Sequence, residues 1–219
     1  SVFVSCESNV TNDSAYSIPF NKAKSYFDSS EYDSAFYYYQ KAKLYSESQN
    51  DFKNIIHPLL MISEIQRIKN DYSGSEETIT EALKYINKHT EIKYQTFIYN
   101  NLGLSMLEQT NYTEALKYYE KSLEITNDDL SKCIIKNNIA YNYIKQNKYL
   151  EAKAILNSTK ENKTLQSNPV EFARIIDNLG YTLFKLNDSN SIIFLNQSKL
   201  LREKENDFSH RGHSWHPAG

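Results

Sequence analysis

Apolar and aromatic residues recur along this chain at the spacing of three and four residues that amphipathic helices require. The clearest example runs through Tyr112, Ala115 and Tyr119, which fall on one side of a helix and predict a buried stripe. Leu102 and Met106, four residues apart, lie one helical turn from each other. They predict a second helix just upstream.

A repeated hairpin follows from this pattern. The two helices are separated by Gln109-Thr110-Asn111, which is long enough only for an antiparallel turn. Positions equivalent to Ala115 recur after 40, 40, 37 and 40 residues. In chain order they are Ala35, Ser75, Ala115, Ala152 and Ile192. In the last three copies a Gly or Ala lies 12 residues earlier, and we expect these small residues to let the two helices approach closely.

The pattern resembles the tetratricopeptide repeat. The best copy spans about 96–129 and the second about 133–166. Its signature residues are Tyr99, Leu102, Gly103, Met106, Tyr112, Ala115 and Tyr119. The resemblance implies an all-α fold, a right-handed superhelix of about five antiparallel helix pairs (a TPR-like α-solenoid). This chain departs from the usual period of 34 residues, and Asn127 replaces the closing Pro.

The resemblance divides the chain into three parts. A signal remnant or tether is expected at 1–15, the helical array at 16–206, and a flexible or cloning-derived tail at 207–219. Repeats are expected at about 16–49, 56–89, 96–129, 133–166 and 173–206. Pro19 and Pro169 suit the first turns of helices that begin near Ser17 and Asn168. Pro58 implies either a separate turn before it or a longer, kinked helix.

Composition narrows the classes of function. The formal net charge is −2, and acidic and basic residues are mixed along the chain. Because no basic block occurs, the sequence does not predict nucleic-acid binding. No apolar stretch reaches the roughly 20 residues that span a bilayer. The two cysteines, Cys6 and Cys133, are too far apart in sequence to suggest a disulfide framework or a metal site. Cys133 is expected to be a packed, inert thiol.

The sequence lacks the residue spacings of the common catalytic motifs. No phosphate loop, His-Glu-x-x-His or Gly-x-Ser-x-Gly motif occurs, so we expect no enzyme, no cofactor and no metal. Glu76-Glu77 and Asp128-Asp129 fit an acid–base pair or, more simply, the first turn of a helix or a solvated loop. His210, His213 and His216 have a metal-compatible spacing, but they lie in the expected tail.

The N-terminal residues suggest a lipid anchor. Phe3-Val4-Ser5-Cys6 resembles the end of a bacterial lipoprotein signal, and Cys6 would then be the lipid attachment site. The polar run Glu7–Ser14 would tether the array to the membrane. The alternative is a cloning boundary. We expect contact with a membrane only through this anchor, and therefore a bacterial cell-envelope location, or otherwise a cytoplasmic one.

One group of residues predicts a binding groove. In the resembled family the first helix of each pair lines the concave surface. In this chain the position just before the signature Leu, aligned across the repeats, holds an Asn in four of the five copies and Met61 in the second. The asparagines are Asn21, Asn101, Asn138 and Asn178, with Asn100, Asn137 and Asp177 one position earlier in the last three repeats. Mid-helix Asn is a poor helix former, and its amide both donates and accepts hydrogen bonds with a peptide backbone. The alternative is that these amides bond between neighbouring helices or face water.

The expected groove also has apolar and basic residues. Leu104, Tyr141 and Tyr181 would supply side-chain pockets, with Lys145 and Lys185 near the edges. Asn100 and Leu104 stand where the family's carboxylate clamp would need bases, so a clamp for a terminal carboxylate is not expected.

The function expected from these residues is non-catalytic binding of a protein or extended peptide. The Asn/Lys/Ile/Tyr-rich composition resembles the extracytoplasmic tetratricopeptide regions of Bacteroidetes regulators and sensor proteins. This resemblance implies the sensory or scaffold part of a bacterial signalling protein. Two alternatives stay open: a stand-alone lipoprotein adaptor in envelope assembly, and an enzyme or an enzyme's regulatory cap.

Overall fold

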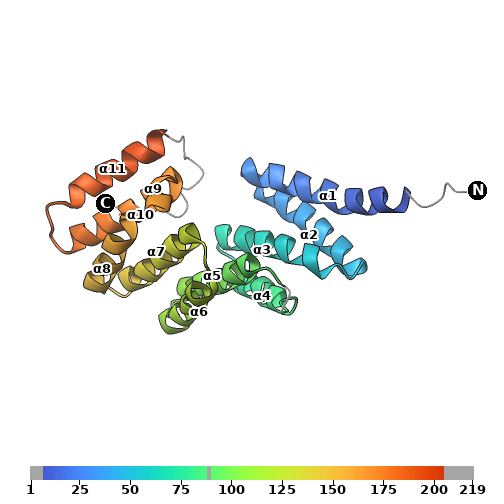
Figure 1. Cartoon of the computed structure of the whole chain (residues 1–219), viewed down its shortest axis with the longest axis horizontal. Helices are drawn as coiled ribbons and strands as arrows, with labels where there is room; N and C mark the ends of the chain where they lie inside the picture. Colours follow the sequence, from blue (N-terminus) through green and yellow to red (C-terminus); the bar gives the residue numbers. More distant parts are fainter. Residues whose placement is uncertain (1–6, 88–89, 205–219) are drawn as a thin grey trace, which may run out of the picture. The chain divides into compact units, whose positions relative to one another are not determined.

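The fold is all-α, as the sequence predicts. A computed structural model describes residues 7–87 and 90–204, and these residues form eleven helices and no strand (Figure 1). Ten helices follow one another as five successive pairs, and the short α9 (Lys163–Gln166) lies between the fourth and fifth pairs. The chain divides into two compact units between Ser105 and Met106, and each unit is described by itself.

Unit 1 consists of two complete hairpins and most of a fifth helix. Its helices are α1 (Glu7–Asp28), α2 (Tyr32–Ser48), α3 (Phe52–Ile68), α4 (Tyr72–Leu83) and α5 (Ile92–Glu108), which crosses the division. Helix α2 packs between α1 and α3, and α3 packs against α4. One core cluster contains Ala23, Ala35, Tyr39, Ile62 and Ile65. Small and large residues therefore alternate where α1, α2 and α3 meet.

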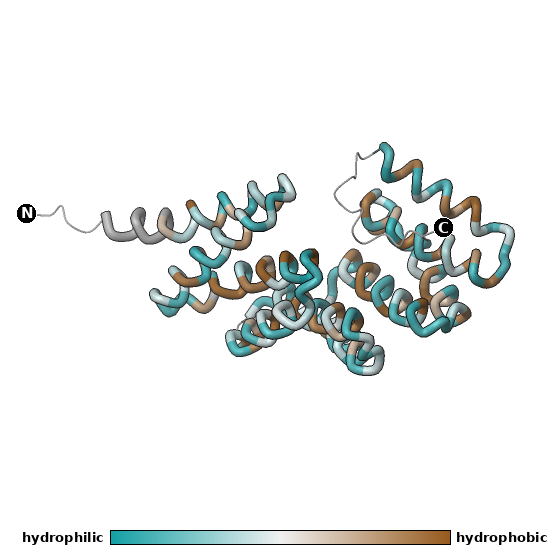
Figure 2. Tube along the Cα trace, turned by 180° about the vertical axis from the view of Figure 1, so that it is seen from behind, coloured by the Kyte–Doolittle hydropathy of each residue, from teal (hydrophilic) through white to brown (hydrophobic). Residues whose placement is uncertain are grey.

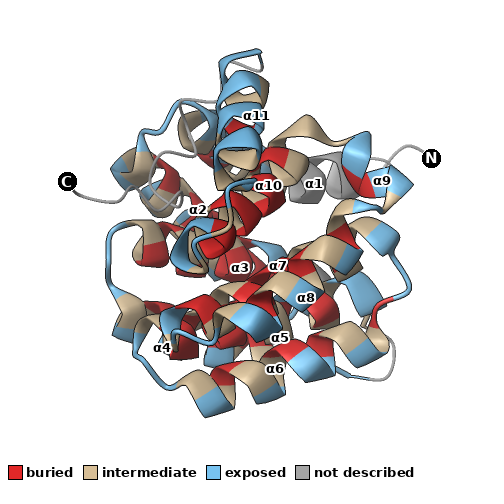
Figure 3. Cartoon of the chain, turned by 90° about the vertical axis from the view of Figure 1, so that its left-hand side faces the viewer, coloured by how far each residue is buried: buried red, intermediate tan, exposed pale blue. Residues whose placement is uncertain are grey.

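Unit 2 holds the remaining helices. They are α6 (Tyr112–Ile125), α7 (Asp129–Lys145), α8 (Tyr149–Lys160), α9, α10 (Pro169–Lys185) and α11 (Ser191–Lys204). Helix α10 contacts α7, α8, α9 and α11, and its buried residues form a continuous stripe (Figure 3). The core of this unit contains Ala152, Leu156, Leu165, Leu179 and Leu183, and none of these side chains is more than 4% exposed.

The small residues at the start of the second helices are buried, as expected, in four of the five pairs. Ala35, Ala115 and Ala152 are fully buried, and Ser75 is 1% exposed. The Ser75 hydroxyl lies 2.8 Å from that of Ser63 and 3.2 Å from that of Ser105. In the second pair, hydrogen-bonded hydroxyls therefore replace the apolar contact that alanine makes elsewhere.

The fifth pair departs from the predicted register. Ile192, expected at the close contact, is 58% exposed, and apolar residues alternate with polar ones along α11 (Figure 2). The close contact is made by Leu195 instead, because a Cβ added at Gly180 would lie 2.8 Å from its Cγ. The turn before α11 is longer than the turns within the other four pairs, and the Asp188 carboxylate holds it by accepting a hydrogen bond from the backbone of Asn190. The added residues shift the contact along α11.

One helix boundary also differs from the expectation, and at Pro58 the structure matches the longer helix, one of the two alternatives. Helix α1 begins at Glu7, not near Ser17, so Pro19 lies inside the helix and the expected tether from Glu7 onward is helical. The polar run before Pro19 contains no Gly or Pro to break a helix. Pro58 likewise lies inside the single helix α3, so no separate turn precedes it. Asn168 caps α10 with Pro169 in its first turn, as predicted.

The turns after α1, α2, α3, α5, α7 and α10 share one backbone geometry. Each contains a residue with φ between 52° and 62°, and none of these residues is glycine. They are Ser30, Asn50, Asn70, Thr110, Asn147 and Asn187. The next N–H donates to the carbonyl five residues earlier, as from Asn111 to Met106 at 2.8 Å. Asparagine tolerates this left-handed conformation better than most residues, which suits an Asn-rich, Gly-poor chain.

Thr110 is the least suitable of these turn residues, because its branched Cβ crowds the left-handed conformation. We expect Thr110→Gly to stabilise the chain by about 1 kcal/mol, since glycine avoids this strain at a smaller cost in unfolded-chain entropy. The measurement is the midpoint of urea unfolding. Asn147→Gly is the matched control and should change stability by less than about 0.5 kcal/mol. An equal gain in both variants would contradict the role of the β-branch.

Candidate functional site

Helices α7 and α10 carry the same series of side chains. Asn137, Asn138, Tyr141 and Lys145 on α7 correspond, 40 residues later, to Asp177, Asn178, Tyr181 and Lys185 on α10. The helical period places Tyr and Lys, four residues apart, on one side of each helix. These eight positions are called the α7–α10 face below. It contains eight of the twelve residues expected in the groove, and the other four lie in unit 1.

An amide–amide hydrogen bond joins the two helices of the α7–α10 face. Asn178 donates through Nδ2 to Oδ1 of Asn137 at 2.8 Å. Asn137 is only 3% exposed and Asn138 9%, whereas Asn178 is half-buried. This bond matches the alternative in which the amides connect neighbouring helices. The asparagine amides therefore lie beneath the α7–α10 face, and the hydrogen bond between Asn178 and Asn137 holds α7 against α10.

The side chains above these amides are aromatic and basic. Tyr141 and Tyr181 are half-buried against the core, and their rings lie 5.2 and 5.4 Å from the Nζ atoms of the exposed Lys145 and Lys185. These distances fit cation–π contacts. Burial raises the pKa of Tyr181 above its usual value. Each helix thus presents an aromatic ring with a lysine ammonium group over it.

Asp177 is directed toward α11. Its carboxylate lies 3.1 Å from the guanidinium of Arg202 and accepts a hydrogen bond from the Ser198 hydroxyl at 3.3 Å. Within the residues that the structure describes, neither Lys145 nor Lys185 forms a salt bridge. The acid of the face is therefore paired with α11 and not with the two lysines.

Unit 1 places its expected groove residues differently. Asn21 is exposed on α1, Asn100 and Leu104 are half-buried on α5, and Asn101 is 4% exposed. The Nδ2 of Asn101 has no hydrogen-bond partner among the described residues. The residue that corresponds to Asn137, at the same separation before Asn101, is the buried Leu60, which offers no acceptor. The amide pair seen between α7 and α10 is therefore not repeated between α3 and α5.

A row of rings crosses the first helices of unit 1, and the sequence analysis did not find it. Tyr16 stacks on Phe20 at 5.3 Å, Phe20 meets His57 edge-on at 4.8 Å, and His57 lies 6.4 Å from Tyr94. Burial lowers the pKa of His57, and the ammonium groups of Lys93 and Lys24 lower it further. The one available signal was the single-turn spacing of Tyr16 and Phe20. At neutral pH the row is an uncharged aromatic surface.

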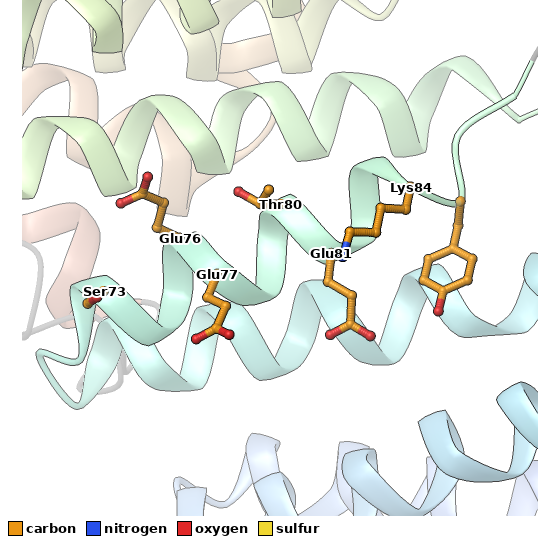
Figure 4. Close-up of a pocket in the computed structure, with 7 residues that line it drawn as sticks. Ser73, Glu76, Glu77, Thr80, Glu81 and Lys84 are labelled. Atoms are coloured by element: carbon orange, nitrogen blue, oxygen red, sulfur yellow. The ribbon is translucent and has the colours of Figure 1, made fainter.

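A shallow hollow follows the outer side of α4 (Figure 4). It is lined by Ser73, Glu76, Glu77, Thr80, Glu81, Lys84 and Tyr85, all from α4 or the residues just after it. Glu76 and Glu77 point away from each other, so they form no acid–base pair. Glu81 lies 2.7 Å from Lys43 of α2. One helix cannot enclose a small molecule, and this hollow is an ordinary charged surface.

The remaining expected residues have structural roles or lie outside the described residues. Asp128 caps α7 and accepts a hydrogen bond from the Ser131 N–H, and bonding to Ser131 lowers the pKa of its carboxyl. Cys133 is a free, buried thiol whose pKa is raised by burial, as expected for a packed cysteine. Cys6 and the histidine-rich tail lie outside the described residues.

The described part of the chain contains neither a candidate membrane span nor a cluster of metal-ligating side chains. No helix there is long and apolar enough to cross a bilayer. Across the same residues, no three His, Cys, Asp or Glu side chains gather closely enough to hold a metal ion.

Comparison with known proteins places this arrangement in a class. Residues 94–164 match the model of the tetratricopeptide repeat family. A solved structure of nearly identical TPR-like repeats from Podosopora anserina is 11% identical, with a TM-score of 0.67 over 89% of this chain and 98% of that one. No curated protein sequence matches the chain. The structure is thus an array of helical hairpins of the TPR type, and residues 94–164 carry the sequence match to the tetratricopeptide repeat family.

Two further solved structures share the fold. The Rap conjugation gene regulator of plasmid pLS20, in complex with the Phr* peptide, is 13% identical with a TM-score of 0.78. The match covers 94% of this chain but only 58% of that regulator, so this chain spans little more than half of its length. Bacillus thuringiensis PlcR, in complex with the peptide PapR7 and DNA, is 10% identical with a TM-score of 0.73, over 94% of this chain and 75% of PlcR.

Proposed function

We propose that this chain is a peptide-binding module and that the α7–α10 face is its binding surface. The carrying observation is the repeated series of amide, half-buried tyrosine and exposed lysine on two helices that contact each other. Rigid aromatic rings supply contact area for a peptide at low entropic cost. Phe184, 57% exposed on α10, adds apolar surface close to Tyr181. The peptides bound in two structures with the same fold support this function.

The test begins with random peptides displayed on phage and selected on the whole chain. We expect Tyr141→Ala/Tyr181→Ala to weaken a selected peptide by about tenfold or more, since truncated aromatic anchors typically cost over 1 kcal/mol each. Tyr37→Ala is the matched control, because Tyr37 also carries a lysine four residues later, with Nζ 4.6 Å from its ring, but lies on a second helix.

Hydrogen exchange distinguishes loss of the site from loss of folding. Bound peptide should slow exchange of α7 and α10 amides in the parent chain, and circular dichroism should show the parent's helix content in both variants at the temperature of the binding assay. Protection confined to other helices, or equal weakening by Tyr37→Ala, would reject the α7–α10 face as the site.

We further infer that the module is the sensory or scaffold part of a bacterial signalling protein. The support is the shared fold with two regulators whose structures hold peptides. The full-length gene is the test: a downstream membrane span with a kinase or DNA-binding domain fits this role, and a stop codon directly after the array does not.

A stand-alone lipoprotein adaptor in the cell envelope is the second candidate. It is favoured by Phe3-Val4-Ser5-Cys6, which resembles a lipoprotein cleavage site. Mass spectrometry of the native protein from the membrane fraction is the test. A diacylglyceryl group on Cys6 supports the adaptor and an envelope location, and an unmodified mature amino terminus rejects both.

A further inference from the structure

The two lysines of the α7–α10 face occupy the same place on successive first helices. Lys145 and Lys185 each lie four residues after a tyrosine and beside its ring. Neither lysine forms a salt bridge with a described residue. The carboxylate of Glu108 attracts Lys145 but forms no salt bridge with it. Two other charged residues of α10 are paired, Arg174 with Glu171 at 3.3 Å and Asp177 with Arg202. A bound chain would therefore meet two cations one helix apart.

The separation of the two helices determines which peptide geometry fits. The hydrogen bond between Asn178 and Asn137 means that α7 and α10 are in direct contact, and packed helices have axes about 8–10 Å apart. A polyproline II helix advances about 3.1 Å per residue with three residues per turn, so side chains three apart share a side at about 9 Å. A β-strand repeats its side after two residues, at about 7 Å. The polyproline II repeat is the one closer to the usual separation of two packed helix axes.

We propose that the α7–α10 face selects peptides in the polyproline II conformation that carry two acidic side chains three residues apart. One carboxylate would meet Lys145 and the other Lys185, and the residues between them would pack on Tyr141 and Tyr181. This inference rests on the proposed peptide-binding function and names its ligand class.

Three fluorescein-labelled, C-terminally amidated octapeptides test the register directly. Their sequences are PPDPPDPP, with acids three apart, PPDPDPPP, with acids two apart, and PPNPPNPP, without charge. Binding to the whole chain is followed by fluorescence anisotropy at low and at physiological salt. We expect the first peptide to bind about five times more tightly than either of the others, and this advantage to shrink with salt.

Single substitutions assign the effect to the two lysines. Lys145→Gln and Lys185→Gln should each weaken PPDPPDPP about two- to fivefold and leave PPNPPNPP unchanged. Lys41→Gln is the matched control, since Lys41 also stands over a tyrosine but lies on α2. All three lysines are exposed, so the variants should fold like the parent.

The possible failures separate this inference from the proposed function. Three results would reject the proposed spacing of three residues between acids. They are equal affinity for PPDPPDPP and PPDPDPPP, unchanged binding in both lysine variants, and no binding of any octapeptide. Selected phage peptides that still protect α7 and α10 would then leave the peptide-binding function standing. If those peptides do not protect the face either, both proposals fail.

Discussion

Ala152→Trp is expected to destabilise this chain by about 3 kcal/mol, at the upper end of the usual cost of overpacking. Ala152 is fully buried in the core of unit 2, where α8 packs against α7 and α10. An indole there would displace Leu156 or Leu179 and separate the helices. For a chain of this size, the melting temperature should fall by roughly 6–12 °C. Thermal unfolding followed by circular dichroism measures this shift.

The matched control for this substitution is the preceding residue. Glu151 is exposed on the same turn of α8, so Glu151→Trp adds the same side chain without entering the core. We expect its melting temperature to stay within about 2 °C of the parent. If both variants melt alike, Ala152 does not lie at a close helix contact, and the repeat register of the fourth pair is wrong.

Gly180→Leu is expected to destabilise the chain by about 2–3 kcal/mol, the second largest effect. A Cβ at this position would lie 2.8 Å from Leu195 Cγ and 3.0 Å from the Leu195 backbone nitrogen, so α10 and α11 would have to move apart. The better helix propensity of leucine offsets only about 1 kcal/mol of this strain. Urea unfolding at constant temperature gives the difference in stability.

A second substitution identifies the neighbour that limits space at Gly180. Leu195→Ala in the Gly180→Leu background should recover part of the lost stability, because it removes the side chain that the new leucine strikes. Ile192→Ala in the same background should recover nothing, since Ile192 is exposed. Recovery by Ile192→Ala would instead support the register expected from the sequence and contradict the structure.

The helical period and the small-residue positions were predictable from sequence because both are local. Tyr112, Ala115 and Tyr119 define a helix face without any knowledge of its neighbours, and Ala115 is fully buried as expected. Ile192 was placed wrongly because the pattern assumes a turn of constant length, and the turn at Asp188 is longer. The start of α1 was missed because Pro19 signals a first turn but tolerates an interior position.

The candidate site was predictable as a set of positions but not as a set of contacts. The sequence selected both Asn137 and Asn178, and left open whether such amides face a ligand or a neighbouring helix. Their mutual bond depends on how α7 packs against α10, between residues 41 apart in the chain. The pairing of Asp177 with Arg202 likewise depends on where α11 lies. Periodicity assigns a residue to a helix face, whereas its partner depends on packing between helices.

The shared turn geometry has a consequence for how the number of hairpins in this chain can change through gene duplication or loss. Within each of the first four pairs, three residues separate the helices. Between pairs the separation ranges from three residues at 49–51 to eight at 84–91 and at 161–168, where α9 is included. A gene segment cut at these outer connections carries a hairpin together with its own turn and N-cap. Duplication or loss of whole hairpins therefore preserves the geometry of every remaining one, and a fusion partner is better inserted at 84–91 than at 109–111.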